Sequence, residues 1–314
     1  MSGHLELGAG REFDLLRAIY ARLGDSGAAL GDDCALLPVG GTTLAVSIDL
    51  SLEGVHFRAD WLSFEEIGWR AAAGALSDLA AEGAEPVGIL VSLGVPAGRV
   101  NPAVEIMAGV GAAAASVGAR VLGGDLVRSE RYLVDCCVLG TAERPVRRAG
   151  AKPGDAVWVT GRLGGAGEAL AKLRAGERPG GALAERFARP APRVAAGRWL
   201  AAHGAKAMID VSDGLAADAG HLAAASGVAV EIELERVPCW PGVGPHDAVA
   251  SGEEFELLVA LPSGFDNAQA RAFESQTGLS LTQIGQCAAG SGIRLTAGGR
   301  PVSPPPGYDH FAAG

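Results

Sequence analysis

The sequence predicts an α/β protein built from two domains, and three observations support this fold class. Segments with helical periodicity alternate with strand-like apolar runs along the whole chain. Residues 142–155 (AERPVRRAGAKPGD) mix proline, glycine and charge between two apolar strands, which is typical of a domain boundary. The chain has 314 residues, 48% hydrophobic and 20% charged, which is enough for two cores. We therefore expect domains at 1–145 and 146–314.

The first half contains clear signals for helix ends. Ser63 followed by Glu66 is a capping box, and Pro102 is typical of the first turn of a helix. In order, we expect a helix over 11–23, a strand over 43–49, a helix from Ser63 to Gly83, a strand over 87–95, a helix from Asn101, and strands within 119–125 and 132–140.

The second half continues the alternation and adds a glycine-rich turn. Residues 161–167 (GRLGGAG) follow a strand and open a helix, so their backbone amides could bind an anion. In order, we expect a strand over 156–161, this turn and its helix, a helix ending near His203, a strand over 206–210, a helix from Ser212, and strands over 228–234 and 255–262.

Composition and charge disfavour several classes of function. The net charge is −10, and no lysine and arginine cluster is dense enough to follow a phosphate backbone, so we expect no nucleic-acid partner. No apolar stretch approaches the roughly 18 residues of a membrane span, and the N-terminus lacks a signal-peptide pattern, so we expect a cytoplasmic protein without membrane contact. The five cysteines show no C-x-x-C spacing, which favours reduced core residues over zinc ligands.

Aspartates recur at the ends of the expected elements. They are Asp32 and Asp33 before a strand, Asp49 at the end of one, Asp125 after VLGG, and Asp210 and Asp213 around the turn IDVSDG. Taken singly, each is better explained as a turn or helix-cap residue. As a set they offer only oxygen ligands, which suits Mg²⁺ rather than zinc or iron.

Asp78 differs from these residues because it lies inside the helix expected after Ser63. It shares a helical face with the apolar Ile67 and Ala71 and with Gly74. A carboxylate on an apolar stripe must be paired, protonated or bound to a metal, because an unpartnered buried charge is costly. Asp78 is therefore the strongest single sign of a metal site.

A partly hydrated Mg²⁺ site commonly serves a phosphate substrate. The chain has no G-x-x-x-x-G-K-[ST] sequence, which argues against a P-loop enzyme. The stretch from Gly109 to Ala114 matches a dinucleotide fingerprint only loosely and falls inside an alanine-rich helix, so we interpret it as a packing feature. No G-x-S-x-G or H-E-x-x-H sequence occurs, which disfavours serine hydrolases and zinc hydrolases.

Eight motifs follow one another over residues 31–311. They are GDDCALL, SIDLSLEGVHF, LSDLAAEGAEP, LGGDLVRS, RAGAKPGDAVWVTG, IDVSDGLAADAGHLA, SGEEFELL and GYDHF. This ordered set resembles the thiamine-monophosphate kinase family of the aminoimidazole-ribonucleotide-synthetase-like ATP-binding superfamily. GVHF and GYDHF point to the kinases rather than to their purine-synthesis relatives.

The resemblance implies a fold and an activity. The fold has an N-terminal α/β domain, whose sheet pairs with that of a second subunit in a homodimer, and a C-terminal α+β domain. The activity is transfer of the γ-phosphoryl group of ATP to thiamine monophosphate, giving thiamine diphosphate, with several Mg²⁺ ions. The acceptor phosphate has a second pKa of about 6 and is already an anionic nucleophile, so no general base is expected.

The resemblance also implies roles for individual residues. Mg²⁺ ligands are expected at Asp33, Ser47, Asp49, Asp78, Asp125, Asp210 and Asp213. ATP contacts are expected at Gly124, Asp125, Arg148 and Ser212. Contacts with thiamine monophosphate are expected at His56 and Glu253. The six aspartates of this set should converge on one cleft.

From the residues alone, other interpretations stay open. Arg148 could equally be a solvated linker residue, His56 an ordinary polar residue at a strand end, and Glu253 and Glu254 exposed charges that lead into a strand.

Five positions depart from the family pattern. They are Ile48, Ala75 and Leu126, Ser251 in place of glycine, and Pro305 in place of an aromatic residue that could stack on thiamine. Loss of stacking could weaken acceptor binding or change acceptor choice. Two alternatives therefore stay open: a superfamily relative that uses the same ATP and Mg²⁺ site on another acceptor, and a non-catalytic paralogue that binds ATP or metal.

Overall fold

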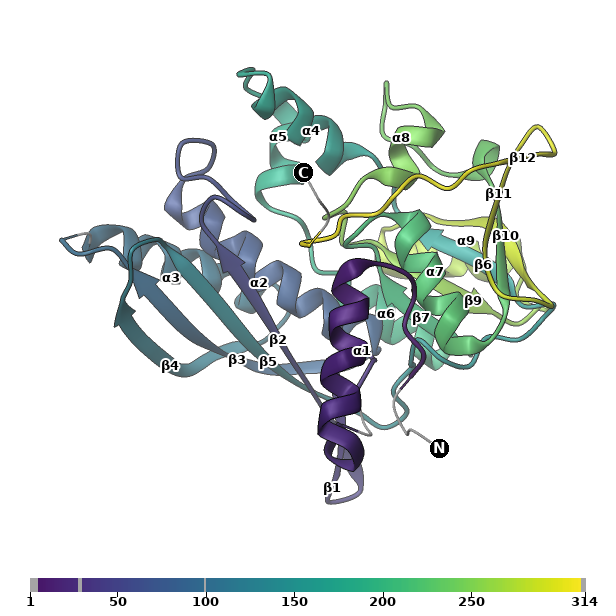
Figure 1. Ribbon diagram of the computed structural model, residues 1–314, viewed down its shortest axis with the longest axis horizontal. Coiled ribbons are helices and arrows are strands. Elements are labelled where there is room, and N and C mark those ends of the chain that lie inside the picture. Colours follow the sequence, from purple (N-terminus) through teal and green to yellow (C-terminus); the bar gives the residue numbers. More distant parts are fainter. Residues whose placement is uncertain (1–4, 28–29, 99, 312–314) are drawn as a thin grey trace.

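The structure is a computed structural model that describes residues 5–27, 30–98 and 100–311. It confirms the mixed α/β class, with a five-stranded sheet in the first half of the chain and a seven-stranded sheet in the second. Figure 1 shows the first sheet on the left and the second on the right. In the described part of the chain, no helix is both long enough and apolar enough to cross a membrane.

The first sheet contains the strands expected in the N-terminal half. They are β1 (Ala35–Val39), β2 (Thr42–Leu52), β3 (Glu85–Val95), β4 (Arg120–Arg128) and β5 (Leu133–Ala142). Their order is β1-β2-β5-β3-β4, in which β3 and β4 are parallel and the other neighbours are antiparallel. Helix α2 (Phe64–Ala81) packs on β2 and β5, and helix α3 (Val100–Ser116) packs on β3, β4 and α2.

The two faces of this sheet differ in exposure. Along β5 buried and half-exposed residues alternate, and the buried residues belong to the core under α2 and α3. The register aligns Ile48, Cys137 and Leu90 in one row across β2, β5 and β3. Ile48 and Leu90 are exposed. We call this uncovered side the open face.

The second sheet carries the remaining strands. They are β6 (Ala156–Thr160), β7 (Ala207–Asp210), β8 (Ala229–Glu233), β9 (Leu257–Leu261), β10 (Leu281–Ala288), β11 (Gly292–Ala297) and β12 (Arg300–Val302). Their order is β12-β11-β8-β10-β6-β9-β7, with β8 and β11 parallel and the other neighbours antiparallel.

Helices cover both faces of this second sheet, with α7 (Leu215–Ser226) on one face and α6 (Val194–Ala202) and α9 (Asn267–Thr277) on the other. The second half also contains α4 (Gly165–Arg174), α5 (Gly181–Ala188), α8 (Pro245–Ala250) and a 3₁₀ turn at Leu234–Arg236, and a further 3₁₀ turn, Gly24–Gly27, lies in the first half. Val157 and Val159 pack in a core with Leu215 of α7. Trp158, between them, packs on the other side with Leu200 of α6 and Phe273 of α9.

Helix α2 is shared between the two halves of the chain. Its Leu76 belongs to the core of the first sheet, whereas Ala80 belongs to the core that α6 forms with the second sheet. A Cβ at Gly197 of α6 would lie 1.9 Å from the Ala80 carbonyl oxygen, so the two helices nearly touch there. Leu173 of α4 and Phe187 of α5 come from the second half of the chain and pack in the core of the first sheet.

The N-terminal segment also crosses between the halves. Gly8 N donates to His221 Nδ1 of α7 at 3.2 Å, and Arg11 N, at the start of helix α1 (Arg11–Leu23), donates to Asp309 Oδ2 at 2.6 Å. Phe13 packs on the ring of His221. Residues near both ends of the chain are thus attached to the second half, and the division at residue 145 stays a prediction.

Most expected elements agree with the structure within a few residues, and two differ for identifiable reasons. Helix α7 begins at Leu215 rather than Ser212, because the Asp218 carboxylate accepts the backbone N–H groups of Ser212 and Asp213 and holds them in a loop. Strand β9 begins at Leu257, because Phe255 has φ of 48°, which is incompatible with a strand.

Glycines allow α2 and α3 to approach closely. A Cβ at Gly68 would lie 1.8 Å from the Ile106 carbonyl oxygen, and one at Gly109 would lie 1.9 Å from that of Glu65. The stretch that begins at Gly109 is therefore a packing feature, as expected. Gly111, on the same helix, has no neighbouring atom within 4 Å of a Cβ.

We expect Gly109→Ala to destabilise the protein and Gly111→Ala to stabilise it. The first methyl group collides with backbone, whereas the second removes the roughly 1 kcal/mol helix penalty of glycine without a clash. Urea unfolding of both variants beside the wild type measures the two effects. If both substitutions change the free energy of unfolding by the same amount and with the same sign, the close approach of α2 and α3 is contradicted.

Candidate active site

One face of α2 carries four residues at intervals of four. They are Arg70, Gly74, Asp78 and Glu82, the last of which caps the helix. This spacing aligns them along the helix, with a rise of about 6 Å per step. Gly74 and Asp78 are expected on this face from the sequence, whereas Arg70 and Glu82 are not among the expected site residues, although the same spacing would have found them.

Asp78 belongs to a cluster of three carboxylates with Asp33 and Asp210. One oxygen from each residue lies within 4.8 Å of the other two. Two hydroxyl groups orient the cluster, since Ser47 Oγ donates to Asp78 at 2.5 Å and Ser77 Oγ donates to Asp210 at 2.7 Å. The three acids come from the segment before β1, from α2 and from the end of β7, so the cluster forms only where the two halves meet.

Burial and mutual repulsion disfavour the charged form of these acids. Burial first, then the charges of Asp210, Asp33 and Asp49, raises the pKa of Asp78 well above its usual value. Burial and the charge of Asp33 raise the pKa of Asp210 to about 7. The cluster therefore concentrates more negative charge than the surrounding protein neutralises.

Arginines from beyond the first sheet hold the GDD segment. Arg148 donates from Nε and Nη2 to the two oxygens of Asp33, each at 2.9 Å. Arg147 Nε donates to Asp32 at 2.7 Å. Arg148 is therefore not a solvated linker residue. Burial still raises the pKa of Asp33, against the lowering effect of Arg148.

Glu82 is fully buried next to the same two aspartates. One of its oxygens lies within 4.8 Å of oxygens of Asp32 and Asp33. Its Oε1 accepts from Cys34 N at 3.4 Å, whereas Oε2 has no hydrogen-bond partner among the described residues. Burial and the two aspartate charges raise the pKa of Glu82 well above its usual value, which favours the protonated acid.

A small cavity of about 40 Å³ adjoins Asp49. Asp49, His56, Arg70 and Glu253 line it together with apolar side chains, so it brings together both residues expected to contact thiamine monophosphate. A Cβ at Gly74 would lie 2.8 Å from Asp49 Oδ2, so this glycine makes room for the carboxylate. Burial and the charge of Glu253 raise the pKa of Asp49 to about 6.

Glu253 has an unusual backbone. Its φ is 56°, in a region that residues other than glycine rarely occupy and that surrounding structure must hold. Glu253 N donates to Ser212 O at 2.6 Å, and Phe255 N donates to Val211 O at 2.8 Å. The Glu253 carboxylate pairs with Arg70. Glu253 is thus fixed beside the loop of Ser212 and is not a free charge leading into a strand.

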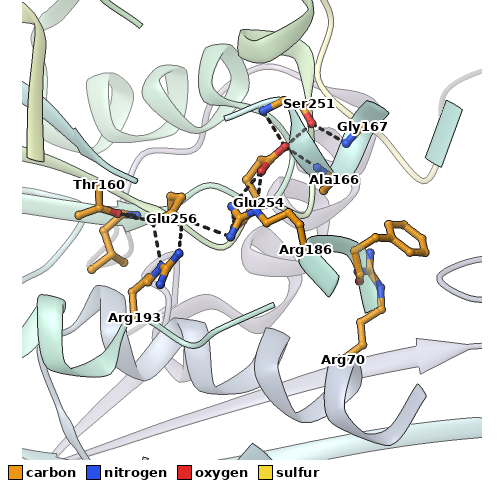
Figure 2. A network of polar contacts seen from close by, with 12 residues as sticks. Arg70, Thr160, Ala166, Gly167, Arg186, Arg193, Ser251, Glu254 and Glu256 are labelled. Atoms are coloured by element: carbon orange, nitrogen blue, oxygen red, sulfur yellow. Dashed lines mark hydrogen bonds and ion pairs between the residues drawn. The ribbon is translucent and has the colours of Figure 1, made fainter. Parts of the chain in front are cut away.

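Glu254 points the other way, into a buried polar network (Figure 2). Its Oε1 accepts from Gly164 N at 2.8 Å, Ala166 N at 3.0 Å and Ser251 Oγ at 2.6 Å, and its Oε2 accepts from Arg186 Nη2 at 2.8 Å. The glycine-rich turn therefore does bind an anion, but the anion is a carboxylate of the protein itself. The turn is not free to bind a phosphate through these amides.

Glu256 extends this network on the far side of Arg186 (Figure 2). It accepts from Arg193 Nη2 at 2.6 Å and Thr160 Oγ1 at 2.7 Å, and it lies 3.2 Å from Arg186 Nη1. Glu254 and Glu256 are both almost completely buried. This ionic network supports the turn that carries Glu253, and sequence reasoning missed its arginines because they lie far away along the chain.

The C-terminal motif GYDHF lies beside Asp213 and His56. Tyr308 N donates to Asp213 O at 3.1 Å, and the ring of His310 lies 5.0 Å from that of His56. Burial and the charge of Glu12 raise the pKa of Asp213 to about 6. Asp213 thus lies in the loop between β7 and α7, close to both the tail and the N-terminal helix.

Asp125 and Gly124 lie apart from the other candidate residues. Both are exposed on the edge strand β4, and Asp125 stands in register with Ser92 of β3. Among the described residues, neither Asp125 nor Asp49 belongs to a group of three ligand atoms within 4.8 Å of one another, and Asp213 groups with Asp218 and His221. Asp49 still acts on Asp78 through its charge, whereas β5 and β3 separate Asp125 from β2, so the expected convergence of six aspartates is not met for Asp125 within this chain. Its role stays a prediction.

The positions that depart from the family pattern have different surroundings. Ile48 is 68% exposed on the open face and Leu126 is 67% exposed on β4, whereas Ala75 is completely buried. Ser251 contributes to the network, because its hydroxyl donates to Glu254 and accepts from Gly167 N at 2.9 Å. Pro305 is half-buried in the C-terminal tail.

Comparison with known proteins agrees with the geometry. The N-terminal domain of AIR synthase related proteins matches residues 31–142, and the C-terminal domain matches residues 152–298. The thiamine-monophosphate kinase of Halobacterium salinarum is 33% identical, over 90% of this chain and 93% of its own length. That of Salmonella typhimurium is 34% identical over 96% of both chains.

A solved structure has the same fold as this chain. The protein described as "AaThiL complexed with AMPPCP and TMP" superposes with a TM-score of 0.85 and 31% identity, covering 96% of this chain and 97% of its own. The two matched domains, the identity over most of the chain and the shared fold lead to one conclusion. This chain belongs to the thiamine-monophosphate kinase family.

Proposed function

We propose that this chain transfers the γ-phosphoryl group of ATP to thiamine monophosphate, giving thiamine diphosphate and ADP. The observation that carries this proposal is the carboxylate cluster around Asp78, next to the cavity that holds His56 and Glu253. Asp49 connects the two, because it lines the cavity and its charge acts on Asp78. The solved relative in complex with AMPPCP and TMP supports ATP and thiamine monophosphate as the substrates.

The residues of the cluster fit Mg²⁺. Asp33, Asp78 and Asp210 offer only oxygen ligands, and burial together with neighbouring carboxylates raises their pKa values, so a bound divalent cation would stabilise their charged forms. We propose that these residues hold Mg²⁺ with help from Ser47, Asp49 and Asp213. When bound, the ions neutralise charge between the two phosphate groups and on the transferred phosphoryl group.

The side chains of the protein have a positioning role in this reaction. Two unit charges about 4 Å apart repel by roughly 4 kcal/mol at an effective dielectric constant of about 20, so the two phosphates cannot approach without compensation. The hydroxyls of Ser47 and Ser77 fix the orientation of Asp78 and Asp210, the carboxylates that would hold the compensating Mg²⁺. The acceptor phosphate is itself the nucleophile, and we propose no protein group as general base.

The remaining functional assignments extend this proposal. Arg148 and Ser212 would contact ATP, and both lie near the carboxylate cluster, since Arg148 binds Asp33 and Ser212 follows Asp210 by two residues. Retention of the cluster argues against a non-catalytic paralogue. A cytoplasmic location, expected from the N-terminal sequence, stays a prediction.

We also propose that the chain forms a homodimer through the open face of the first sheet. Ile48, Leu50 and Leu90 are exposed there, and exposed apolar clusters commonly mark interaction surfaces. The family resemblance implies the same sheet-to-sheet pairing.

Asp78→Asn should lower kcat by roughly 100-fold or more, because it removes charge that stabilises the transferring phosphoryl group through the metal. Thiamine diphosphate formation from ATP, Mg²⁺ and thiamine monophosphate provides the measurement. The exposed Asp60→Asn serves as a matched control and should retain activity. A wild type that binds ATP and Mg²⁺ but forms no thiamine diphosphate would overturn the acceptor assignment.

Mg²⁺ should raise the melting temperature more at about pH 8 than at about pH 5. The folded-state pKa values of Asp49, Asp210 and Asp213 are raised from 3.8 to about 6, 7 and 6. The folded protein therefore binds more protons than the unfolded chain in this window, and its stability falls as the pH rises from about 4 to 7. Mg²⁺ binds the deprotonated groups and restores this loss. Calorimetric melts that show equal Mg²⁺ effects at both pH values would contradict a site at these acids.

Leu90→Glu should convert the dimer to a monomer, because it places a charge in the apolar open face. Light scattering after size exclusion gives the mass directly. Val104→Glu is the matched control, since Val104 is exposed on α3 and should leave the dimer intact. A monomeric wild type at micromolar concentration would end the proposal.

A further inference from the structure

We propose that Arg70 binds the phosphate group of the acceptor substrate. This inference rests on the proposed function, which supplies thiamine monophosphate as the acceptor. Arg70 lies on α2, between the motifs SIDLSLEGVHF and LSDLAAEGAEP, and the sequence analysis gave it no role. The structure assigns it to the cavity that also contains Asp49, His56 and Glu253.

The guanidinium of Arg70 is held in place before any substrate arrives. It lies over the ring of Phe187, 4.2 Å from its centroid, and Nη1 donates to the Phe187 carbonyl oxygen. Figure 2 shows the Arg70 side chain extending from α2. The residue is 5% exposed, so little of its conformational freedom remains to be lost on binding.

Arg70 also keeps hydrogen-bonding capacity toward the cavity. Nη2 forms an ion pair with the Glu253 carboxylate, yet it has no hydrogen-bond partner of suitable geometry among the described residues. A buried guanidinium whose Nη2 is held by an ion pair without hydrogen-bond geometry could exchange that carboxylate for a planar or tetrahedral oxyanion, which arginine binds through its fork of N–H groups.

The charges of the cavity point to a substrate that carries both signs. Thiamine monophosphate has a cationic thiazolium ring and a phosphate with a charge of roughly −1.5 to −2. Asp49 and Glu253 would repel that phosphate, and burial with the nearby charge of His310 lowers the pKa of His56, so its ring is neutral at neutral pH. Among the described residues that line this cavity, Arg70 supplies the permanent positive charge.

The position of Arg70 on α2 places the proposed phosphate site on the same helix as Asp78 of the carboxylate cluster. Arg70 precedes Asp78 by two helical turns, a rise of about 12 Å along the axis. Gly74 lies between them and has no side chain, and Asp49 fills part of the space that it leaves. A phosphate bound between Arg70 and Asp49 would therefore face the cluster without crossing another side chain of α2.

Binding selectivity tests this role separately from catalysis. The dissociation constants of thiamine monophosphate and of thiamine are measured by calorimetry for the full-length wild type, Arg70→Gln and Arg70→Lys, each with Mg²⁺ and AMPPCP. Thiamine lacks the phosphate but keeps the ring system. If a substitution at Arg70 acts only through the fold or through Glu253, it changes both dissociation constants by the same factor. Their ratio then stays at the wild-type value.

We expect Arg70→Gln to reduce the preference for thiamine monophosphate over thiamine by about tenfold or more, as loss of a hydrogen bond between charged groups predicts. Arg70→Lys keeps the charge without the planar fork and should reduce it by about threefold or more. Arg58→Gln, an exposed arginine paired with Asp60, is the matched control and should keep the wild-type ratio.

The outcomes separate this inference from the proposed function. If the wild type prefers thiamine monophosphate and a folded Arg70 variant keeps the full preference, the role of Arg70 is overturned. The proposed function then still stands. If Arg70→Gln does not fold, Arg70→Lys decides by the same criterion. A wild type that does not bind thiamine monophosphate overturns the proposed acceptor and this inference with it.

Discussion

The burial of charge along helix α2 is the constraint on which the rest of this structure depends. The helix is enclosed by the first sheet, by α3 and by α6, yet it carries Arg70, Asp78 and Glu82 on one face. Charged groups in such a position require partners from elsewhere in the chain, because unpaired buried charge is strongly unfavourable. The two halves of the protein meet along this face, and their junction is the candidate site.

The partners come from segments that are distant in sequence. Asp33 approaches Asp78 from before the first sheet, Asp210 approaches from the end of β7, and Arg148 from the connecting segment binds Asp33. Asp210 and Arg148 come from the second half of the chain, whereas Asp33 and Asp78 both belong to the first, so the contacts of Asp210 with Asp78 and of Arg148 with Asp33 join the two halves. The site and the association of the halves therefore depend on the same interactions, and the excess of carboxylates over arginines leaves a net negative centre suited to Mg²⁺.

The second half contributes a hydrogen-bonded support for the cavity beside Asp49. Glu253 adopts a left-handed backbone, and its neighbour Glu254 is fixed by Arg186 and by the amides of the glycine-rich turn (Figure 2). A strained residue of this kind persists when surrounding contacts hold it. Because Glu253 N also donates to Ser212 O, the cavity beside Asp49 and the carboxylate cluster share one backbone connection.

The sequence by itself determined the fold class, the order of most elements, the capping box at Ser63 and the family, because these follow from local periodicity and from motifs that are contiguous in the chain. It also singled out Asp78, since a carboxylate on an apolar helical stripe is visible in the residue pattern alone. It did not reveal that Glu254 satisfies the glycine-rich turn, that Arg148 binds Asp33, or that Asp125 lies apart from the cluster. Only the tertiary structure decided these points, because each depends on which distant side chain reaches a given atom, and no local pattern encodes that distance.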